Sequence, residues 1–128
     1  GGVLTDYKLA VHWWSKAAEQ GEAWAQYKLG RMYADGKGVV KDLEQAVYWW
    51  NKAAEQGHDW AQYKLGKMYA DEGSEMEDYL VAYMWLEIAS SGGHITASKS
   101  KEKLAGRMSE ADINEAMELA QEWGEKHK

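Results

Sequence analysis

The sequence contains no cysteine, no proline and no phenylalanine. Without cysteine there is neither a disulfide framework nor a thiolate metal site, and the cellular compartment, cytoplasm or periplasm, stays open. Without proline, the residue that interrupts helices most strongly is missing. No apolar run is long enough to cross a bilayer, and the N-terminus carries no basic-then-apolar signal segment. These absences favour an all-α fold with no membrane span.

Positive charge is also in short supply, because the formal net charge is −6. A general nucleic-acid-binding protein needs a basic surface to replace phosphate counterions, so we expect no nucleic-acid partner. At 128 residues, with 45% apolar and 28% charged side chains, the chain has the size and composition of one globular domain. Eight tryptophans and eight tyrosines make up its aromatic content. Each large ring can bury roughly 150–250 Å², which is enough to stabilise a thin stack of helices.

An internal repeat organises the chain. Residues 10–35 and 46–71 differ at only five of 26 positions, at an offset of 36 residues. A period of 20 to 50 residues is typical of a solenoid built from one supersecondary unit. We predict a single domain over 1–128, which comprises a half repeat at 1–21, repeats at 22–57 and 58–93, and a degenerate helix plus a capping helix at 94–128.

Three equivalent helices are predicted from the repeat, at about 6–20, 42–56 and 78–91. Asp6, Asp42 and Asp78 each precede one of them, where a carboxylate can accept the free N–H groups of a first helical turn. Spacing of three and four predicts a buried face with one tryptophan between two alanines. These faces are Ala10, Trp13 and Ala17; Ala46, Trp49 and Ala53; and Ala82, Trp85 and Ala89.

Each of these helices is followed by a glycine and a partner helix. Gly21, Gly57 and Gly93 suit the left-handed conformation that ends many helices. The partner helices are predicted at about 22–34, 58–70 and 94–105, so antiparallel hairpins form. Gly30 and Gly66 lie inside the first two partners. An interior glycine costs about 1 kcal/mol relative to alanine, which indicates that another helix approaches closely there.

The last segment differs from the repeats. Ser109 stands where a side chain can cap a helix, with the carboxylate of Asp112 three residues on, and apolar residues follow at helical spacing. We predict a helix at about 109–126. A solenoid needs a terminal element that is apolar inward and polar outward. The polar side is supplied by Glu115, Glu118, Glu122 and Glu125.

The repeated motif resembles the Sel1-like repeat family, relatives of the tetratricopeptide repeats. It reads A-x-x-W-x-x-x-A-A-x-x-G, as at 46–57, followed by A-x-x-x-L-G-x-x-Y-x-x-G-x-G-V-x-x-D, as at 25–42. The resemblance covers about residues 1–97. It implies an all-α, right-handed α–α superhelix, or solenoid, of antiparallel helical hairpins with a C-terminal capping helix. It also implies an adaptor or scaffold function rather than catalysis.

The resemblance to tetratricopeptide modules also implies a binding groove. In such modules, groove residues lie five and two positions before, and two and five positions after, the leucine of the Leu-Gly pair. In this chain these are Trp24, Tyr27, Arg31 and Ala34, and then Trp60, Tyr63, Lys67 and Ala70. Thr96 stands where a third indole would fall, and Lys99 and Lys103 extend the positive side. The alternative is that Trp24 and Trp60 pack between hairpins.

Other candidate chemistry is weak. The histidines, His12, His58, His94 and His127, lack metal-ligand spacing, and we predict that they lie on the surface. An acidic loop lacks the calcium-loop pattern and is explained in part by helix capping. It comprises Asp71, Glu72, Glu75, Glu77 and Asp78. We find no nucleophile–base pair, phosphate loop or H-E-x-x-H motif, so we expect no enzyme, no metal and no cofactor.

The sequence therefore predicts a protein-interaction module that binds a peptide or helix segment, with acidic groups opposite Arg31 or Lys67. A structural spacer or oligomerisation module, and a carbohydrate- or cell-wall-binding repeat protein, are the alternatives. The helix at 6–20 has no preceding hairpin in this sequence, so its face with Trp13 and Trp14 is expected to be uncovered. We therefore expect either that the chain is a piece of a longer array or that it self-associates through this helix.

Overall fold

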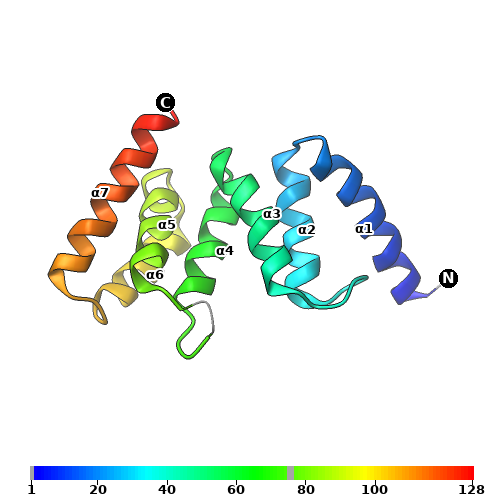
Figure 1. Cartoon of the computed structure of the whole chain (residues 1–128), viewed down its shortest axis with the longest axis horizontal. Helices are drawn as coiled ribbons and strands as arrows, with labels where there is room; N and C mark the ends of the chain where they lie inside the picture. Colours follow the sequence, from blue (N-terminus) through cyan, green and yellow to red (C-terminus); the bar gives the residue numbers. More distant parts are fainter. Residues whose placement is uncertain (1, 75–76) are drawn as a thin grey trace. The chain divides into compact units, whose positions relative to one another are not determined.

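The computed structural model describes residues 2–74 and 77–128, and Glu75 of the acidic loop lies outside them. The described residues form seven α-helices and no strand (Figure 1). The helices are α1 (Val3–Glu19), α2 (Ala23–Asp35), α3 (Leu43–Glu55), α4 (Asp59–Tyr69), α5 (Tyr79–Ser91), α6 (Ile95–Ala105) and α7 (Glu110–Lys126). The seven helices expected from the repeat pattern are thus confirmed, with most ends within two residues of the predicted positions.

Helix termini follow the predicted chemistry in most places. The carboxylates of Asp42 and Asp78 accept the backbone N–H groups of Gln45 and Val81, and the Ser109 hydroxyl accepts that of Asp112. The glycines that follow α1, α3 and α5 have φ angles of 93°, 90° and 99°, as predicted for Gly21, Gly57 and Gly93. These caps set where each hairpin turns.

The start of α1 was predicted wrongly. α1 begins at Val3, and Gly2 rather than Asp6 occupies its N-cap position, so Asp6 lies inside the first turn. The backbone N–H groups of Asp42 and Asp78 are each held by a carbonyl of the preceding helix, at 2.9 and 2.7 Å. Asp6 has no preceding helix in this sequence, and its N–H instead donates to the carbonyl of Gly2 as part of α1.

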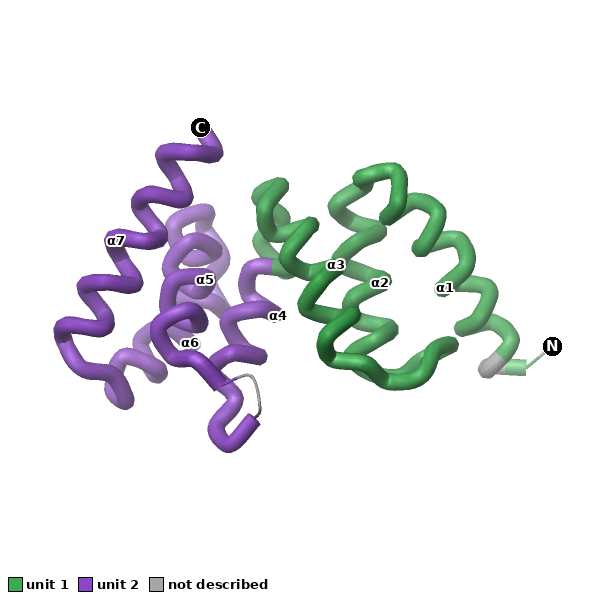
Figure 2. The backbone as a smooth tube through the Cα atoms, viewed as in Figure 1, with its two compact units in different colours: residues 1–61 green, residues 62–128 purple. Residues whose placement is uncertain are grey.

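The chain divides into two compact units, residues 1–61 and 62–128 (Figure 2). In the first unit, α2 packs between α1 and α3. Its buried centre is formed by Ala18, Ala25 and Leu29, against which Trp14 and Trp49 pack. Small alanines beside large indoles let these helices approach closely.

The tryptophan pairs of α1 and α3 are oriented differently from the prediction. Trp13, predicted to be buried, exposes 59% of its surface, whereas its neighbour Trp14 packs into the first unit's core. In α3, Trp49 is half-buried and Trp50 is buried. Adjacent helix positions differ by about 100° in direction, so a one-residue shift moves the buried face. Only the third predicted face, with Trp85, is buried throughout.

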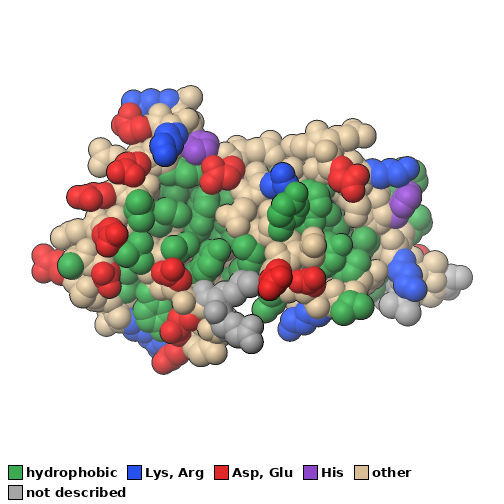
Figure 3. Space-filling model, in the orientation of Figure 1, with side chains coloured by type: hydrophobic (Ala, Val, Ile, Leu, Met, Phe, Trp, Pro, Cys, Tyr) green, Lys and Arg blue, Asp and Glu red, His purple; other side chains and the backbone are tan. Residues whose placement is uncertain are grey.

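The second unit is built around α5, which packs against α6 and α7. Its core includes Tyr83, Leu86 and Ala97, and Ala116 contributes the apolar side of α7. Trp85 meets Trp123 of α7 edge to face, with 6.1 Å between ring centroids. Acidic side chains gather along the outer side of α7 (Figure 3), as expected of a capping helix. No helix in the described part of the chain has the length and apolar composition needed to cross a bilayer.

Candidate functional site

Two equivalent tryptophans present nearly half of their surface to solvent. Trp24 lies in the first turn of α2 and is 46% exposed, and Trp60 lies in the first turn of α4 and is 43% exposed. The Lys28 ammonium lies 5.1 Å from the centre of the Trp24 ring, in cation–π contact. Large exposed rings at one repeat position are the kind of feature that marks interaction surfaces.

Tyr27 lies beside Trp24 but is only 5% exposed. The imidazole of His58, from the start of α4, stacks on its ring with 4.9 Å between centroids, and Trp24 contacts both rings at 5.6 Å. Burial raises the pKa of the Tyr27 hydroxyl, partly opposed by the charge and hydrogen bond of Arg31. Tyr27 therefore supports Trp24 from beneath, and its ring is not open to a partner as the groove pattern implied.

His58 has a structural function that the sequence analysis missed. Its Nδ1 accepts the backbone N–H of Ala61 at 3.2 Å, which caps the first turn of α4. The side chain is half-buried, and this burial lowers the pKa of the imidazole, while the nearby Asp59 acts in the opposite direction. The sequence feature that could have predicted this cap is the position of His58, directly after the glycine that follows α3 and three residues before Ala61.

The same arrangement recurs in the second unit. Tyr63 is buried and stacks with His94 at 5.0 Å, and His94 Nδ1 accepts the N–H of Ala97 at 3.0 Å to cap α6. The predicted surface position of His94 is wrong, because only 6% of this residue is exposed. The fixed pairing of tyrosine and histidine 31 residues apart follows from the repeat period.

The candidate cations are placed at the surface. Arg31 lies over the Tyr27 ring at 5.9 Å in the first unit, and Lys67 lies over the Tyr63 ring at 5.8 Å in the second. Both are exposed, as are Lys99 and Lys103 of α6. Each tyrosine–cation pair holds a positive charge one helical turn from a buried ring, where it can meet a carboxylate.

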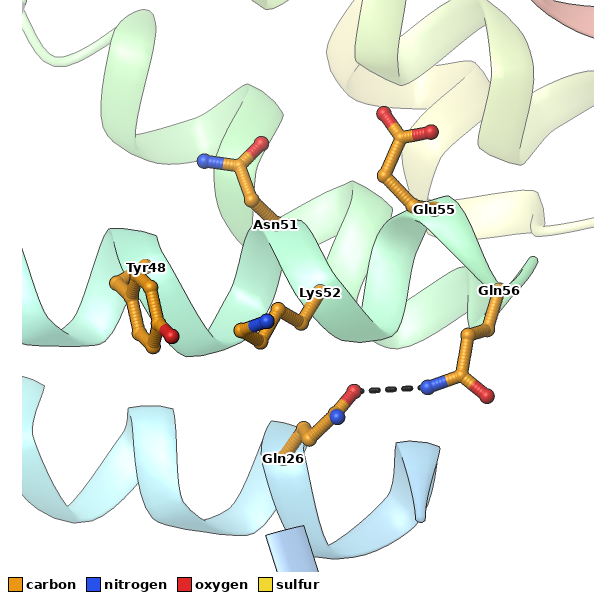
Figure 4. A pocket seen from close by; sticks show the side chains of 6 residues that line it. All are labelled: Gln26, Tyr48, Asn51, Lys52, Glu55 and Gln56. Carbon is orange, nitrogen blue, oxygen red and sulfur yellow. Dashed lines mark hydrogen bonds between the residues drawn. The ribbon is translucent and has the colours of Figure 1, made fainter. Parts of the chain in front are cut away.

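An open depression of about 500 Å³ lies between α2 and α3 in the first unit (Figure 4). Its floor includes Gln26, whose amide bridges the helices: it donates to the carbonyl of Ala18 at 3.2 Å and accepts from Gln56 at 2.9 Å. Gln56 also donates to the carbonyl of Gly21. Tyr48, Asn51, Lys52 and Glu55 complete the lining. The side chains of Gln26 and Gln56 are used in hydrogen bonds that connect the helices. We therefore interpret this depression as part of the packing between helices and not as a ligand site.

Metal ligands do not converge within residues 2–74 and 77–128, where no group of three or more histidine or carboxylate side chains is placed to hold an ion. Of the acidic loop, Glu72 instead pairs with Arg107 at 2.7 Å, and Glu77 accepts the backbone N–H of Gly73.

Comparison with known proteins identifies the repeat. The sequence profile described as Sel1 repeat matches residues 1–22, 25–58, 61–94 and 102–127. The chain belongs to the Sel1 repeat family. The last match, 102–127, covers the end of α6 and all of α7, which the sequence pattern had assigned to a degenerate helix and a capping helix. The search of curated proteins returned no match.

Two solved Sel1 structures resemble the chain. One is a protective antigen of uropathogenic Escherichia coli with an SLR fold, at 36% identity and a TM-score of 0.90 over 99% of this chain and 27% of that one. The other is a Sel1 repeat protein from Oxalobacter formigenes, at 31% identity and a TM-score of 0.71 over 94% of this chain and 51% of that one. The predicted all-α solenoid fold is confirmed. Sel1 repeats are generally protein-interaction modules.

Proposed function

We propose that this Sel1 chain is a non-enzymatic binding module that captures an acidic, partly apolar peptide segment of another protein. The observation that carries the proposal is the exposure of Trp24 and Trp60, large rings at equivalent repeat positions that the fold leaves nearly half uncovered. Each is followed seven residues later by an exposed cation, Arg31 or Lys67. Within each of these two helices, the indole and the cation lie two turns apart on the same face.

The chemistry of these side chains selects the partner. Tryptophan and arginine are the side chains most enriched among residues that dominate binding energy. An indole that is already positioned by Tyr27 and His58 loses little rotamer freedom when a peptide covers it. In the first unit, the Arg31 guanidinium can hold a carboxylate with two hydrogen bonds. In the second unit, Lys67, Lys99 and Lys103 each carry a single exposed charge. An acidic segment with apolar side chains matches both features.

The spacer alternative requires the indoles to be buried within the chain. Their exposed fractions disfavour it. A carbohydrate ligand would use the same rings through stacking, but it would gain little from the cations unless it carried acidic groups.

The proposal is tested with a fluorescein-labelled peptide of alternating glutamate and leucine, titrated with the protein in a fluorescence anisotropy experiment. A lysine–leucine peptide and a neutral chitin oligosaccharide serve as competing probes. We expect the Glu–Leu peptide to bind, and Trp24→Ala with Trp60→Ala to weaken binding at least about 30-fold, because the loss of even one anchor residue costs roughly 2 kcal/mol or more. Arg31→Glu with Lys67→Glu should also abolish the preference over the lysine peptide.

Tyr48→Ala with Lys52→Glu is the matched control. Tyr48 is 51% exposed, with the Lys52 ammonium 5.1 Å from its ring, so this pair has the same chemistry on a different helix, α3. The control should bind like the wild type. Equal loss in the control, or binding of the oligosaccharide in preference to the peptide, would contradict the proposal.

A second surface supports self-association. Leu9 and Trp13 are both more than half exposed on α1, and Lys16 lies over the Trp13 ring at 5.3 Å. At the equivalent position in α3, Trp49 packs against the core of the first unit. We propose that Trp13 makes the corresponding contact with a helical hairpin of a second copy.

A further inference from the structure

His58 is connected to both indoles of the proposed site. Its imidazole contacts the Trp24 ring at 5.6 Å and stacks on Tyr27, which lies directly beside Trp24. Through Nδ1 it also caps the helix turn that contains Trp60, because Ala61, whose N–H it accepts, is the next residue. One imidazole therefore positions one indole by ring contact and the other by helix capping.

This function depends on the protonation state of the ring. A neutral imidazole can accept a hydrogen bond at Nδ1 when its proton is on Nε2, whereas an imidazolium carries protons on both nitrogens and accepts none. Protonation would place an N–H opposite the N–H of Ala61. It would also place a positive charge at the N-terminus of α4, where the helix dipole already has its positive end.

We propose that protonation of His58 releases the bound segment, so that the Sel1 module captures its partner near neutral pH and lets it go in mild acid. The inference rests on the proposed function. In acid the first turn of α4 loses the hydrogen bond from Ala61 to His58, so Trp60 is held less firmly. The charged ring is repelled by the Ala61 N–H and shifts from its position against Trp24 and Tyr27. Release follows because the peptide then has to order both indoles on binding.

The groups around His58 set where the change occurs. From α2, the ring faces the Tyr27 hydroxyphenyl and the Trp24 indole, and these carry the cations Arg31 and Lys28 at 5.9 and 5.1 Å. From α4, Asp59 is the nearby anion. Burial outweighs this carboxylate, and the pKa of His58 is lower than the ordinary value of 6.5. The module therefore stays in its binding state at neutral pH and changes below it.

The test compares wild type with His58→Asn. Asparagine is a good N-cap residue that does not titrate, so the variant keeps α4 capped at every pH. His12→Asn is the matched control, because His12 also contacts a tryptophan, Trp13, at 5.1 Å but lies exposed on α1. Binding of the Glu–Leu peptide is measured at pH 7.5 and pH 5.5, where its glutamates stay mostly ionised.

We expect the wild type and His12→Asn to bind about fivefold more weakly at pH 5.5, the effect of losing one helix cap. His58→Asn should change less than twofold. Equal loss in His58→Asn and wild type would overturn the inference, as would pH-independent binding by the wild type.

A second readout uses the free protein. The backbone amide of Ala61, followed by ¹⁵N–¹H NMR, should shift with a midpoint below pH 6.5 in wild type and stay constant in His58→Asn. A peptide that fails to bind at either pH would contradict the proposed function, while the Ala61 titration would still decide whether His58 uncaps α4. A constant Ala61 amide in wild type would overturn the switch even if the peptide binds.

Discussion

The indole of Trp50 lies against Gly30 and donates its Nε1–H to the backbone carbonyl of Tyr27, 3.2 Å away. The contact joins α3 to α2 at a point where only glycine leaves room for the ring. It also fixes the backbone of Tyr27, whose side chain supports Trp24. The packing of the repeat and the geometry of the proposed binding site therefore meet at one residue.

Gly30→Ala should destabilise the first unit. A Cβ atom at position 30 would lie 2.5 Å from two atoms of the Trp50 ring, too close for a rigid indole to accommodate without moving. Overpacking costs about 1–3 kcal/mol and the lost hydrogen bond about 1 kcal/mol, partly offset by about 1 kcal/mol of helix propensity. We expect a net loss of about 1–3 kcal/mol in the free energy of unfolding, measured in urea.

Gly124→Ala is the control for that measurement. Gly124 also lies inside a helix, α7, and a Cβ there would meet no atom within 4 Å. This substitution should leave stability unchanged or raise it by up to about 1 kcal/mol. If both variants lose stability equally, glycine propensity rather than the Trp50 contact governs position 30.

The aspartate caps should differ in strength. Asp42→Ala and Asp78→Ala each remove a carboxylate that accepts a backbone N–H at 3.1 and 3.2 Å, and each should cost about 1 kcal/mol in the free energy of unfolding. Asp6→Ala removes no cap and only a first-turn charge, so it should cost less than about half as much. Equal losses of stability at all three positions would mean that Asp6 caps α1, as the sequence pattern predicted.

Stability should fall between pH 7.5 and pH 5.5 through His58. Its pKa is lowered in the folded state by burial, so the unfolded chain binds more protons in this range. The contribution of His58 to the free energy of unfolding is fully present above the ordinary imidazole pKa. It is lost as the pH falls through the lowered pKa of the folded state. Thermal unfolding of the free protein should show a smaller decrease in His58→Asn than in wild type. A larger decrease in the variant would mean that the imidazolium is favoured by the fold.

Self-association should depend on Trp13. Trp13→Glu places a charge on the exposed face of α1 and should yield a monomer in analytical ultracentrifugation at concentrations where the wild type dimerises. Tyr48→Glu, at a similarly exposed ring on α3, is the control and should not change the mass. A monomeric wild type at all concentrations would contradict the proposal.

Much of the fold could be predicted because the signals for helix starts, helix ends and close packing occur at equivalent positions in more than one repeat. Glycines at one period, aspartates before two helices and glycines inside α2 and α4 all correspond to features of the structure. Gly66 even has the same function as Gly30, since a Cβ there would meet Leu86, the equivalent of Trp50, at 2.6 Å. The tryptophan pairs were harder. Helical spacing does not choose between adjacent positions, and in α3 the room that Gly30 leaves for the Trp50 ring accompanies the choice.

The candidate site was predictable only in its outer members. Trp24, Trp60, Arg31 and Lys67 are exposed as expected, because their stripe points away from the packing stripe. Tyr27 and Tyr63 share that stripe but are covered by His58 and His94 from the start of the next repeat. The tyrosine–histidine contacts join residues 31 positions apart, and helical spacing predicts only contacts between residues three or four positions apart. Histidine is also rarer at helix N-caps than aspartate or serine, so its capping function gave little signal.

Binding of the partner at Trp24 and Trp60 is measured by following the indole Nε1–H resonances of all eight tryptophans during titration with the Glu–Leu peptide. We expect the Trp24 and Trp60 signals to shift and saturate together while those of the buried Trp50 and Trp85 stay in place. Shifts confined to other tryptophans, such as Trp13 on α1, would contradict binding at Trp24 and Trp60.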